Sequence, residues 1–269
     1  MKCILGMWIL LTTAAVPALA ETPITSCPFN ITAPGNYVLN ADLTCPVTGI
    51  TITASNVSLN LNGRKITLLG GAQGGVAIRV NGQSAERVHH VAIQGPGLIV
   101  SPSVNVLFDG IFLGFVDYSQ VSQVTIVGAA FEGGIHAIFC NFLTVTSNVV
   151  GRTLGGVLID LTNSTSVTGN DASGNYDGIR VSGGSGNIVN NNIANGNAYE
   201  GISIDNGARV YGNTTNGNGR YGIWTPSTSS QIFSNTSKAN GLFDLFDQNA
   251  CSGPWSDNVF FTANAPCIH

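Results

Sequence analysis

The sequence predicts an all-β protein, a single-domain right-handed parallel β-helix (solenoid) of about nine to ten coils with disulfide-bonded end caps. Three observations predict this fold class. Two columns of residues recur once per coil, the segments between them alternate apolar and polar residues like short strands, and glycine and asparagine fill the turns.

The first column of the repeat is a glycine followed by isoleucine or valine. It recurs at Gly110, Gly134, Gly156, Gly178, Gly201 and Gly222. Successive glycines are 24, 22, 22, 23 and 21 residues apart. A unit of this length that is made of short strands cannot bury its own apolar face, so it must stack on copies of itself.

The second column is an asparagine that keeps the same phase. It recurs at Asn148, Asn170, Asn192, Asn213 and Asn235, with steps of 22, 22, 21 and 22 residues. Asparagine tolerates the left-handed backbone region, and stacked side-chain amides can hydrogen-bond from coil to coil. We therefore expect a structural asparagine ladder at one turn.

The segments between the columns have strand patterning. Residues 178–181 and 186–189 alternate apolar with polar side chains and are bounded by Gly, Asn and Ser, and they are too short for helices. Residues 56–63, 90–95 and 123–128 show the same pattern in larger coils, about 33 residues apart. The predicted stack extends from about residue 35 to about residue 248.

The ends of the chain predict export and capping. Residues 1–20 have the charged start, apolar run and Ala18-Leu19-Ala20 site of a signal peptide, which leaves residues 21–269 as the mature β-helix. No stretch is long enough for an integral membrane segment, so we expect a secreted or periplasmic protein. The open ends of the stack need caps, which we place at about 21–45 and 242–269.

Cysteine positions predict two disulfides. In an oxidising compartment we expect Cys27 to pair with Cys45 and Cys251 with Cys267, which leaves Cys140 as a buried thiol. The alternative is a metal site, but no Cys-x-x-Cys occurs, and we predict none. The adjacent His89 and His90 should face opposite sides of a strand, which argues against joint metal ligation.

Charge excludes one class of partner. The mature chain has nine Lys and Arg against fourteen Asp and Glu, a net charge of −5. Nucleic acid is not expected as a partner, because binding to a phosphate backbone requires a dense basic stripe.

The best candidate site is the outer face of one strand column. If Ile179 and Val181 point into the core, Arg180 points outward, and the same offset in other coils gives an outward column. This column contains Phe112, His136, Leu158, Arg180, Ser203 and Trp224. Flanking positions add Asp160, Asp177, Glu200, Asp205 and Tyr221. Aromatic rings stack on sugar faces, and carboxylates with a cation bind hydroxyl or uronate groups, so the predicted partner is a polysaccharide or oligosaccharide.

We assign expected roles to these side chains. The candidate catalytic residues are His136, Asp160, Arg180 and Asp205, and the candidate substrate-binding residues are Asp177, Glu200, Tyr221 and Trp224. Asp160 and Asp205, two coils and about 9 to 10 Å apart, would suit inverting hydrolysis. In a lyase or epimerase, Arg180 would neutralise a uronate and His136 would act as the base. The alternative is structural: the carboxylates bind backbone amides at turns and Arg180 pairs with them.

The opening Ala33–Leu39, the segment Val57–Gly63, the glycine column and a tail with Cys251, Trp255, Asn258 and Cys267 carry a family resemblance. The sequence resembles the secreted right-handed parallel β-helix repeat proteins, the superfamily of pectate-lyase-like, carbohydrate-binding and sugar-hydrolysis β-helices. The resemblance implies this specific fold, but it implies no specific function. Asn60 stands where many relatives have Asp, and no signature of one enzyme subfamily occurs, so no reaction and no cofactor is assigned.

Two hypotheses for function follow. The first is an exported β-helix that binds an extracellular polysaccharide and processes it by lyase, epimerase or hydrolase chemistry. The alternative is a non-catalytic β-helix for surface interaction or a periplasmic accessory role of the metal-delivery type.

Asp244 and Asp247 are expected to organise the C-terminal cap.

Overall fold

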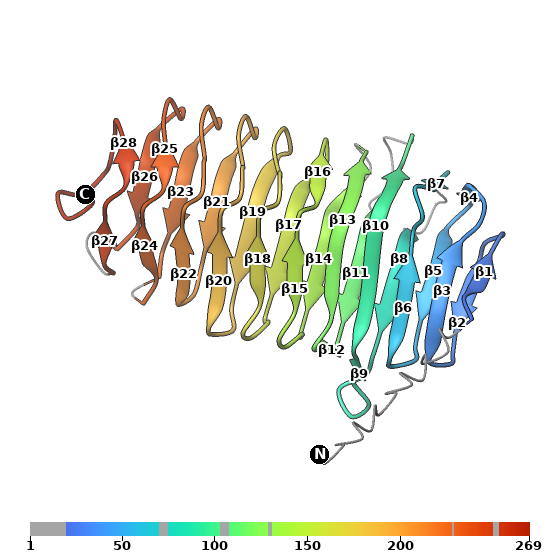
Figure 1. The fold of residues 1–269 in the computed structure, drawn as a ribbon. Helices are drawn as coiled ribbons and strands as arrows, with labels where there is room; N and C mark the ends of the chain where they lie inside the picture. The colour runs from blue at the N-terminus through green and yellow to red at the C-terminus, as the bar shows by residue number, and fades with distance from the viewer. Residues whose placement is uncertain (1–19, 70–74, 103–107, 129–130, 228, 250–252) are drawn as a thin grey trace, which may run out of the picture.

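The computed structural model describes residues 20–69, 75–102, 108–128, 131–227, 229–249 and 253–269. This part of the chain is all β, without helix, and forms a right-handed parallel β-solenoid of about nine turns, which confirms the predicted fold class (Figure 1). The predicted signal peptide lies outside the described residues except for Ala20. No helix in the described ranges is long and apolar enough to cross a membrane.

Two long parallel sheets run along the rod. The ten-stranded sheet has the order β2 (Phe29–Ile31), β5 (Thr48–Ile52), β8 (Gly75–Asn81), β11 (Phe108–Gly114), β14 (Phe131–Ile138), β17 (Gly155–Asp160), β19 (Asp177–Ser182), β21 (Glu200–Ile204), β23 (Tyr221–Thr225) and β26 (Phe243–Asp247). Strands that are neighbours in this sheet come from successive coils, so one residue of each coil aligns with one residue of the next.

The fourteen-stranded sheet forms the second wall. Its main path is β1 (Thr22–Ile24), β3 (Gly35–Leu39), β6 (Val57–Asn60), β10 (Val91–Val100), β13 (Gln120–Val127), β15 (Thr144–Thr146), β18 (Ser166–Thr168), β20 (Asn187–Asn190), β22 (Ala208–Tyr211), β24 (Gln231–Phe233) and β27 (Trp255–Ser256). Off this path lie β4 (Leu43–Cys45), β7 (Lys65–Leu68) and β16 (Val149–Gly151). Two short pairs complete the fold: β9 (Val88–His89) with β12 (Val116–Asp117), and β25 (Thr236–Ser237) with β28 (Val259–Phe260).

The core is a set of apolar ladders between these sheets. Ile179 aligns with Val157 of the preceding coil and Ile202 of the following coil, and all three side chains are buried. Because each coil repeats the same apolar positions, every inward side chain packs on its equivalents above and below.

The glycine column has a steric cause. A Cβ at Gly178 would lie 2.3 Å from the carbonyl oxygen of Gly201 and 2.7 Å from Nδ2 of the buried Asn197. The backbone here passes too close to the next coil for any side chain. Gly178 and Ile179 therefore both face the interior, although neighbouring residues of a strand normally face opposite sides. Because of this interruption, Asp177 lies on the outer face.

The asparagine column forms the predicted ladder. Nδ2 of Asn192 donates to Oδ1 of Asn213 (3.0 Å), Asn170 donates in the same way to Asn192 (3.0 Å), and these side chains are buried. Each amide also satisfies backbone groups of the turn, because Asn192 Nδ2 donates to the carbonyl of Val167 (2.9 Å). A second ladder, which the sequence reading missed, contains Asn175, Asn197, Asn218 and Asn240.

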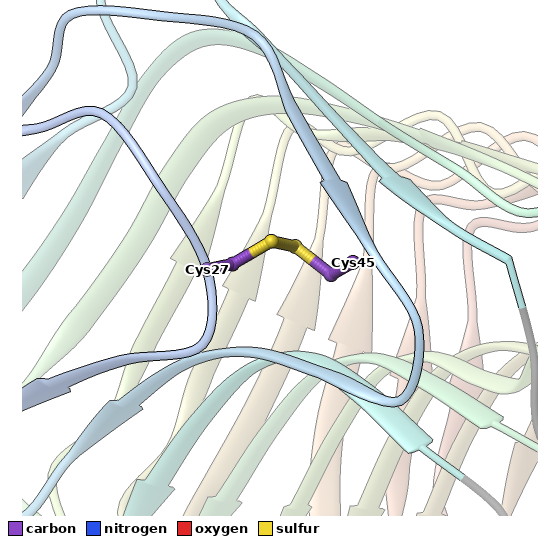
Figure 2. Close-up of a disulfide and its surroundings, with 2 residues drawn as sticks. All are labelled: Cys27 and Cys45. Carbon is purple, nitrogen blue, oxygen red and sulfur yellow. A yellow bond between two sulfur atoms is a disulfide. The ribbon is translucent and has the colours of Figure 1, made fainter.

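The disulfides were predicted correctly where the structure describes them. Cys27 is bonded to Cys45 near the N-terminal end, with their Cα atoms 5.7 Å apart (Figure 2). Cys140 is free and buried, as predicted. Cys267 is disulfide-bonded, but Cys251 lies outside the described residues, so their pairing remains a prediction.

Two buried carboxylates organise the C-terminal end: Asp244 and Asp247, the second of which accepts a hydrogen bond from Nε1 of Trp255 (3.1 Å). Asp244 accepts hydrogen bonds from the backbone N–H groups of Asn240 (3.0 Å), Phe261 (2.8 Å) and Thr262 (3.0 Å). These bonds hold the pKa of Asp244 below its usual value, although burial alone would raise it. Asp244 therefore ties the final segment to the last coil, the role expected for it.

Candidate functional site

Four ionisable side chains form a line across successive coils on the outer face of the ten-stranded sheet. We call Asp109, His136, Asp160 and Arg180 the charge row; they come from β11, β14, β17 and β19. Nδ1 of His136 lies 3.5 Å from Oδ1 of Asp109, and its Nε2 lies 3.2 Å from Oδ2 of Asp160. Nη2 of Arg180 reaches the same Asp160 oxygen at 3.2 Å. The signs of the charges alternate along the row.

The charge row fixes the protonation state of its histidine. Burial by itself would lower the pKa of His136, but the hydrogen bonds and charges of Asp109 and Asp160 outweigh it and raise the pKa to about 9. Burial would raise the pKa of Asp160, yet His136 and Arg180 together lower it. At neutral pH His136 is therefore an imidazolium and Asp160 a carboxylate. A protonated His136 donates hydrogen bonds and does not suit the expected role of a base.

A groove opens beside the C-terminal end of the charge row. It has a volume of about 260 Å³, and its lining includes Leu154, Leu158, Tyr176, Asp177 and Arg180. The side chain of Arg180 is 39% exposed, so part of its guanidinium remains available while Nη2 is held by Asp160. Glu132 also lines the groove, which thus combines a fixed cation, two carboxylates, a ring and two apolar side chains.

A second cluster lies on the next coils of the same face. The guanidinium carbon of Arg220 lies 4.7 Å from the ring centre of Tyr199 and 4.6 Å from that of Tyr221. Its Nη1 lies 3.7 Å from Oε1 of Glu200. Burial, with the nearby charge of Asp177, raises the pKa of Glu200 to about 7. Arg220 therefore covers a carboxyl group that titrates near neutrality.

The structure places the remaining candidates differently. Asp205 lies outside the charge row and accepts a hydrogen bond from Oγ of Ser182 (3.0 Å). Glu200 and Tyr221 are each only 6% exposed: Arg220 lies against both, and the ring of Phe246 stacks on Tyr221 (4.5 Å between ring centres). Trp224 is half-buried and aligns with Ser203 of the preceding coil.

Sequence reasoning gave no role to Asp109 or Arg220, although both had a detectable signal. Asp109 directly precedes a glycine of the repeat, as Asp177 does. Arg220 stands two residues before such a glycine, in a column with Glu132, Leu154, Tyr176 and Tyr199. Stacking of Tyr176 on Tyr199 (5.4 Å between ring centres) shows that this column is in register.

The histidine pair corrects one expectation. Nδ1 of His89 lies 2.8 Å from Nδ1 of His90, so the two rings meet and do not face opposite sides. Strand β9 ends at His89, and His90 has a left-handed backbone (φ 57°), which breaks the alternation on which the expectation depended. Across the described ranges, no group of three or more His, Cys, Asp or Glu side chains is placed to hold a metal ion.

Comparisons with known proteins give one family. The family model described as periplasmic copper-binding protein (NosD) matches residues 89–252, more than half of the chain. No curated protein sequence matches.

Several solved structures share the solenoid. The A-module of the mannuronan C-5 epimerase AlgE6 from Azotobacter vinelandii is 16% identical over 77% of this chain and 68% of its own, with a TM-score of 0.54. The DFA-IIIase of Arthrobacter chlorophenolicus without its lid, in complex with GF2, is 13% identical over 89% and 70%, with a TM-score of 0.59. A mutant of the periplasmic alginate epimerase AlgG is 15% identical over 87% and 76%, with a TM-score of 0.50. At these identities the likeness shows the fold alone.

Proposed function

The chain belongs to the NosD family, and from this premise and the site geometry we propose that it is an exported solenoid that binds a polysaccharide along the outer face of its ten-stranded sheet. The observation that carries the proposal is the groove beside the charge row, where the partly exposed guanidinium of Arg180 stands among Tyr176, Asp177 and apolar side chains. The groove lies across successive coils, so a chain-like ligand can follow the rod.

The groove residues match the groups of a sugar. Arg180 can donate to a hydroxyl or a uronate carboxylate from a guanidinium that Asp160 already orients. Asp177 can accept from a hydroxyl, and Leu154, Leu158 and the Tyr176 ring offer apolar surface to the C–H face of a pyranose. Binding through preoriented charged groups loses little side-chain entropy, which favours affinity.

The geometry supports binding better than catalysis. A general acid or base at neutral pH needs a pKa near 7, and Glu200 has one. However, Glu200 is buried beneath Arg220, and His136 is held as a cation between two carboxylates. Binding in the groove requires no displacement of either group, whereas proton transfer to a sugar by Glu200 would require Arg220 to move.

Copper, which the family description names, does not fit the described residues. The imidazole nitrogens of His89 and His90 come together, but within the described ranges no group of three or more His, Cys, Asp or Glu is placed to hold a metal ion. Biological copper sites generally combine more than two such ligands. Copper is therefore not part of the proposed function.

Two observations support an exported location. The family description is periplasmic, and the bond between Cys27 and Cys45 is of a kind that persists in oxidising compartments. Secretion or a periplasmic location thus remains part of the proposal.

The test is glycan binding by the mature protein and by Arg180→Ala, measured by calorimetry on a panel of uronate-containing and neutral oligosaccharides. We expect Arg180→Ala to weaken binding at the groove by about 1.5 to 3 kcal/mol. The matched control is Arg209→Ala, because Arg209 is an exposed arginine that packs over Tyr211 and Phe233 on the other sheet.

Two outcomes would contradict the proposal: absence of binding to any glycan, or equal losses in Arg180→Ala and Arg209→Ala. The same mixtures should also be assayed for reaction products. New unsaturated ends would identify a lyase and new reducing ends a hydrolase, either of which would show that the groove does more than bind.

A further inference from the structure

A second groove lies at the corner where each coil turns from the ten-stranded to the fourteen-stranded sheet, near β9 and β12 in Figure 1. It has a volume of about 510 Å³. One side is a wall of three rings, His90, Tyr118 and Phe142, and the floor includes Ala92, Gln120 and Thr144. We propose that this corner groove binds a neutral glycan chain, at a site separate from the charge row.

The wall is a ladder with one ring per coil. The rings of His90 and Tyr118 are stacked with centres 5.7 Å apart and planes 14° apart. Those of Tyr118 and Phe142 are 4.6 Å and 5° apart. Tyr118 is 56% exposed and Phe142 is 49% exposed, so the ladder presents a continuous aromatic stripe to solvent.

The backbone beneath this stripe is unfavourable for the residues it carries. His90, Tyr118 and Phe142 have φ values of 57°, 49° and 53°, in the left-handed region that bulky residues rarely adopt. In the next two coils, Ser164 (φ 52°) and Gly186 (φ 68°) have the same left-handed backbone. Glycine adopts this conformation without steric cost.

The equivalence of these positions is visible in the backbone hydrogen bonds. The same backbone hydrogen bond recurs in each coil. The N–H groups of Tyr118, Phe142 and Ser164 donate to backbone carbonyl oxygens of the following coil, those of Asn141, Asn163 and Ser185, respectively. The corner can thus be built with serine or glycine, and folding does not require rings. Exposed rings at positions that disfavour them indicate selection for an interaction.

The last ring of the ladder has an uncovered face. Tyr118 stacks on one side of Phe142, and the next residue in the column, Ser164, is exposed and too small to cover the other side. An open aromatic face of this kind stacks on the C–H face of a pyranose. The ring edges of the preceding coils extend the same apolar wall.

The floor indicates the chemistry of the ligand. Ala92, Gln120 and Thr144 align on three successive strands, β10, β13 and β15, and all three are half-buried. Gln120 and Thr144 offer an amide and a hydroxyl, which can both donate and accept. Among the residues that the structure describes, no carboxylate, lysine or arginine lines the groove, so it matches an uncharged ligand. The repeat of one ring and one floor side chain every ~4.8 Å suits a linear polymer.

The experiment compares glycine variants, because glycine removes the ring and suits the backbone. Phe142→Gly and Tyr118→Gly should weaken binding of cellohexaose at least tenfold in calorimetric titration, while the melting temperature stays unchanged or rises. The control is Leu161→Gly, since Leu161 is also left-handed (φ 51°) and 49% exposed, but does not line the groove. It should keep full affinity.

Several results would overturn the inference. One is a wild-type protein that binds neither cellohexaose nor another neutral hexasaccharide. Another is cellohexaose binding that survives Phe142→Gly or disappears in Arg180→Ala, because the glycan would then occupy only the groove of the proposed function. A third is a dimer, seen by light scattering, that Phe142→Gly converts to monomer, because the stripe would then contact a second copy.

Discussion

His136 and Asp160 are 24 residues apart in the chain, yet Nε2 of the histidine lies 3.2 Å from Oδ2 of the aspartate. They meet because β14 and β17 pair in parallel, with Ile138 opposite Asp160. Asp109 approaches the other nitrogen of the same ring from the preceding coil. One imidazolium thereby links three coils of the solenoid.

This linkage predicts a pH dependence of stability. The folded pKa of His136, about 9, exceeds its ordinary value of 6.5, so the stabilisation is complete below 6.5 and is lost as pH rises through 9. The loss should be about 3 kcal/mol at most. Denaturant unfolding of wild type and His136→Gln should show a stability difference that shrinks between these pH values. A difference that does not change with pH would contradict the assignment.

Glu200 predicts a second effect with a different window. Its folded pKa, about 7, exceeds the ordinary 4.5, so its contribution is complete below 4.5 and is lost as pH rises through 7. Glu200→Gln keeps the shape and cannot ionise. The variant should therefore gain stability relative to wild type as pH increases from 4 to 8, by about 3 kcal/mol at most. A variant that is less stable at pH 8 than at pH 4, relative to wild type, would show that Arg220 needs the carboxylate charge.

The asparagine ladder predicts a large structural loss. Asn192→Ala would leave the backbone N–H of Asn170 and the carbonyl of Val167 buried without their side-chain partner. Unfolding should require about 3 kcal/mol less free energy, because each buried group left unpaired costs about 1 to 3 kcal/mol. The matched control is Asn190→Ala, which removes an outward amide bonded to Thr168 and should cost about 1 kcal/mol or less. Equal losses of unfolding free energy in the two variants would mean that the buried ladder amides stabilise the fold no more than an outward amide does.

The N-terminal disulfide should act mainly on the unfolded chain. The bond from Cys27 to Cys45 spans 18 residues, and replacing both with serine should lower the free energy of unfolding by about 3 kcal/mol.

The Cys251→Ser/Cys267→Ser variant tests the expected C-terminal pairing. Mass spectrometry that finds a free thiol at Cys251 in the protein purified under oxidising conditions would refute that pairing.

The fold was predictable because the same requirement recurs in every coil. Gly178 and its equivalents must lack a side chain, and Asn192 and its equivalents must bond to the next turn, so both appear as columns in one sequence. The alternation of side chains also placed Arg180 and His136 on the outer face. The second ladder, which includes Asn197, was missed because the many other asparagines obscure its period.

The site was less predictable, because the repeat pattern does not determine the direction in which a long side chain extends. Arg220 extends along the rod and covers Glu200 and Tyr221. The sequence alone does not show this direction of its side chain. The state of His136 depended on Asp109, whose position came from the register of β11 against β14. The meeting of His89 with His90 depended on a left-handed residue that interrupts the strand pattern.

The alternation of signs in the charge row also affects how fast a ligand arrives. Asp109, His136, Asp160 and Arg180 carry charges that cancel in pairs over a few ångströms, so their combined field decays well within the Debye length of about 8 Å at physiological ionic strength. A charged ligand is therefore not drawn to the row from a distance. The row itself should therefore add little salt dependence to the association rate, and its contacts should act mainly on the dissociation rate.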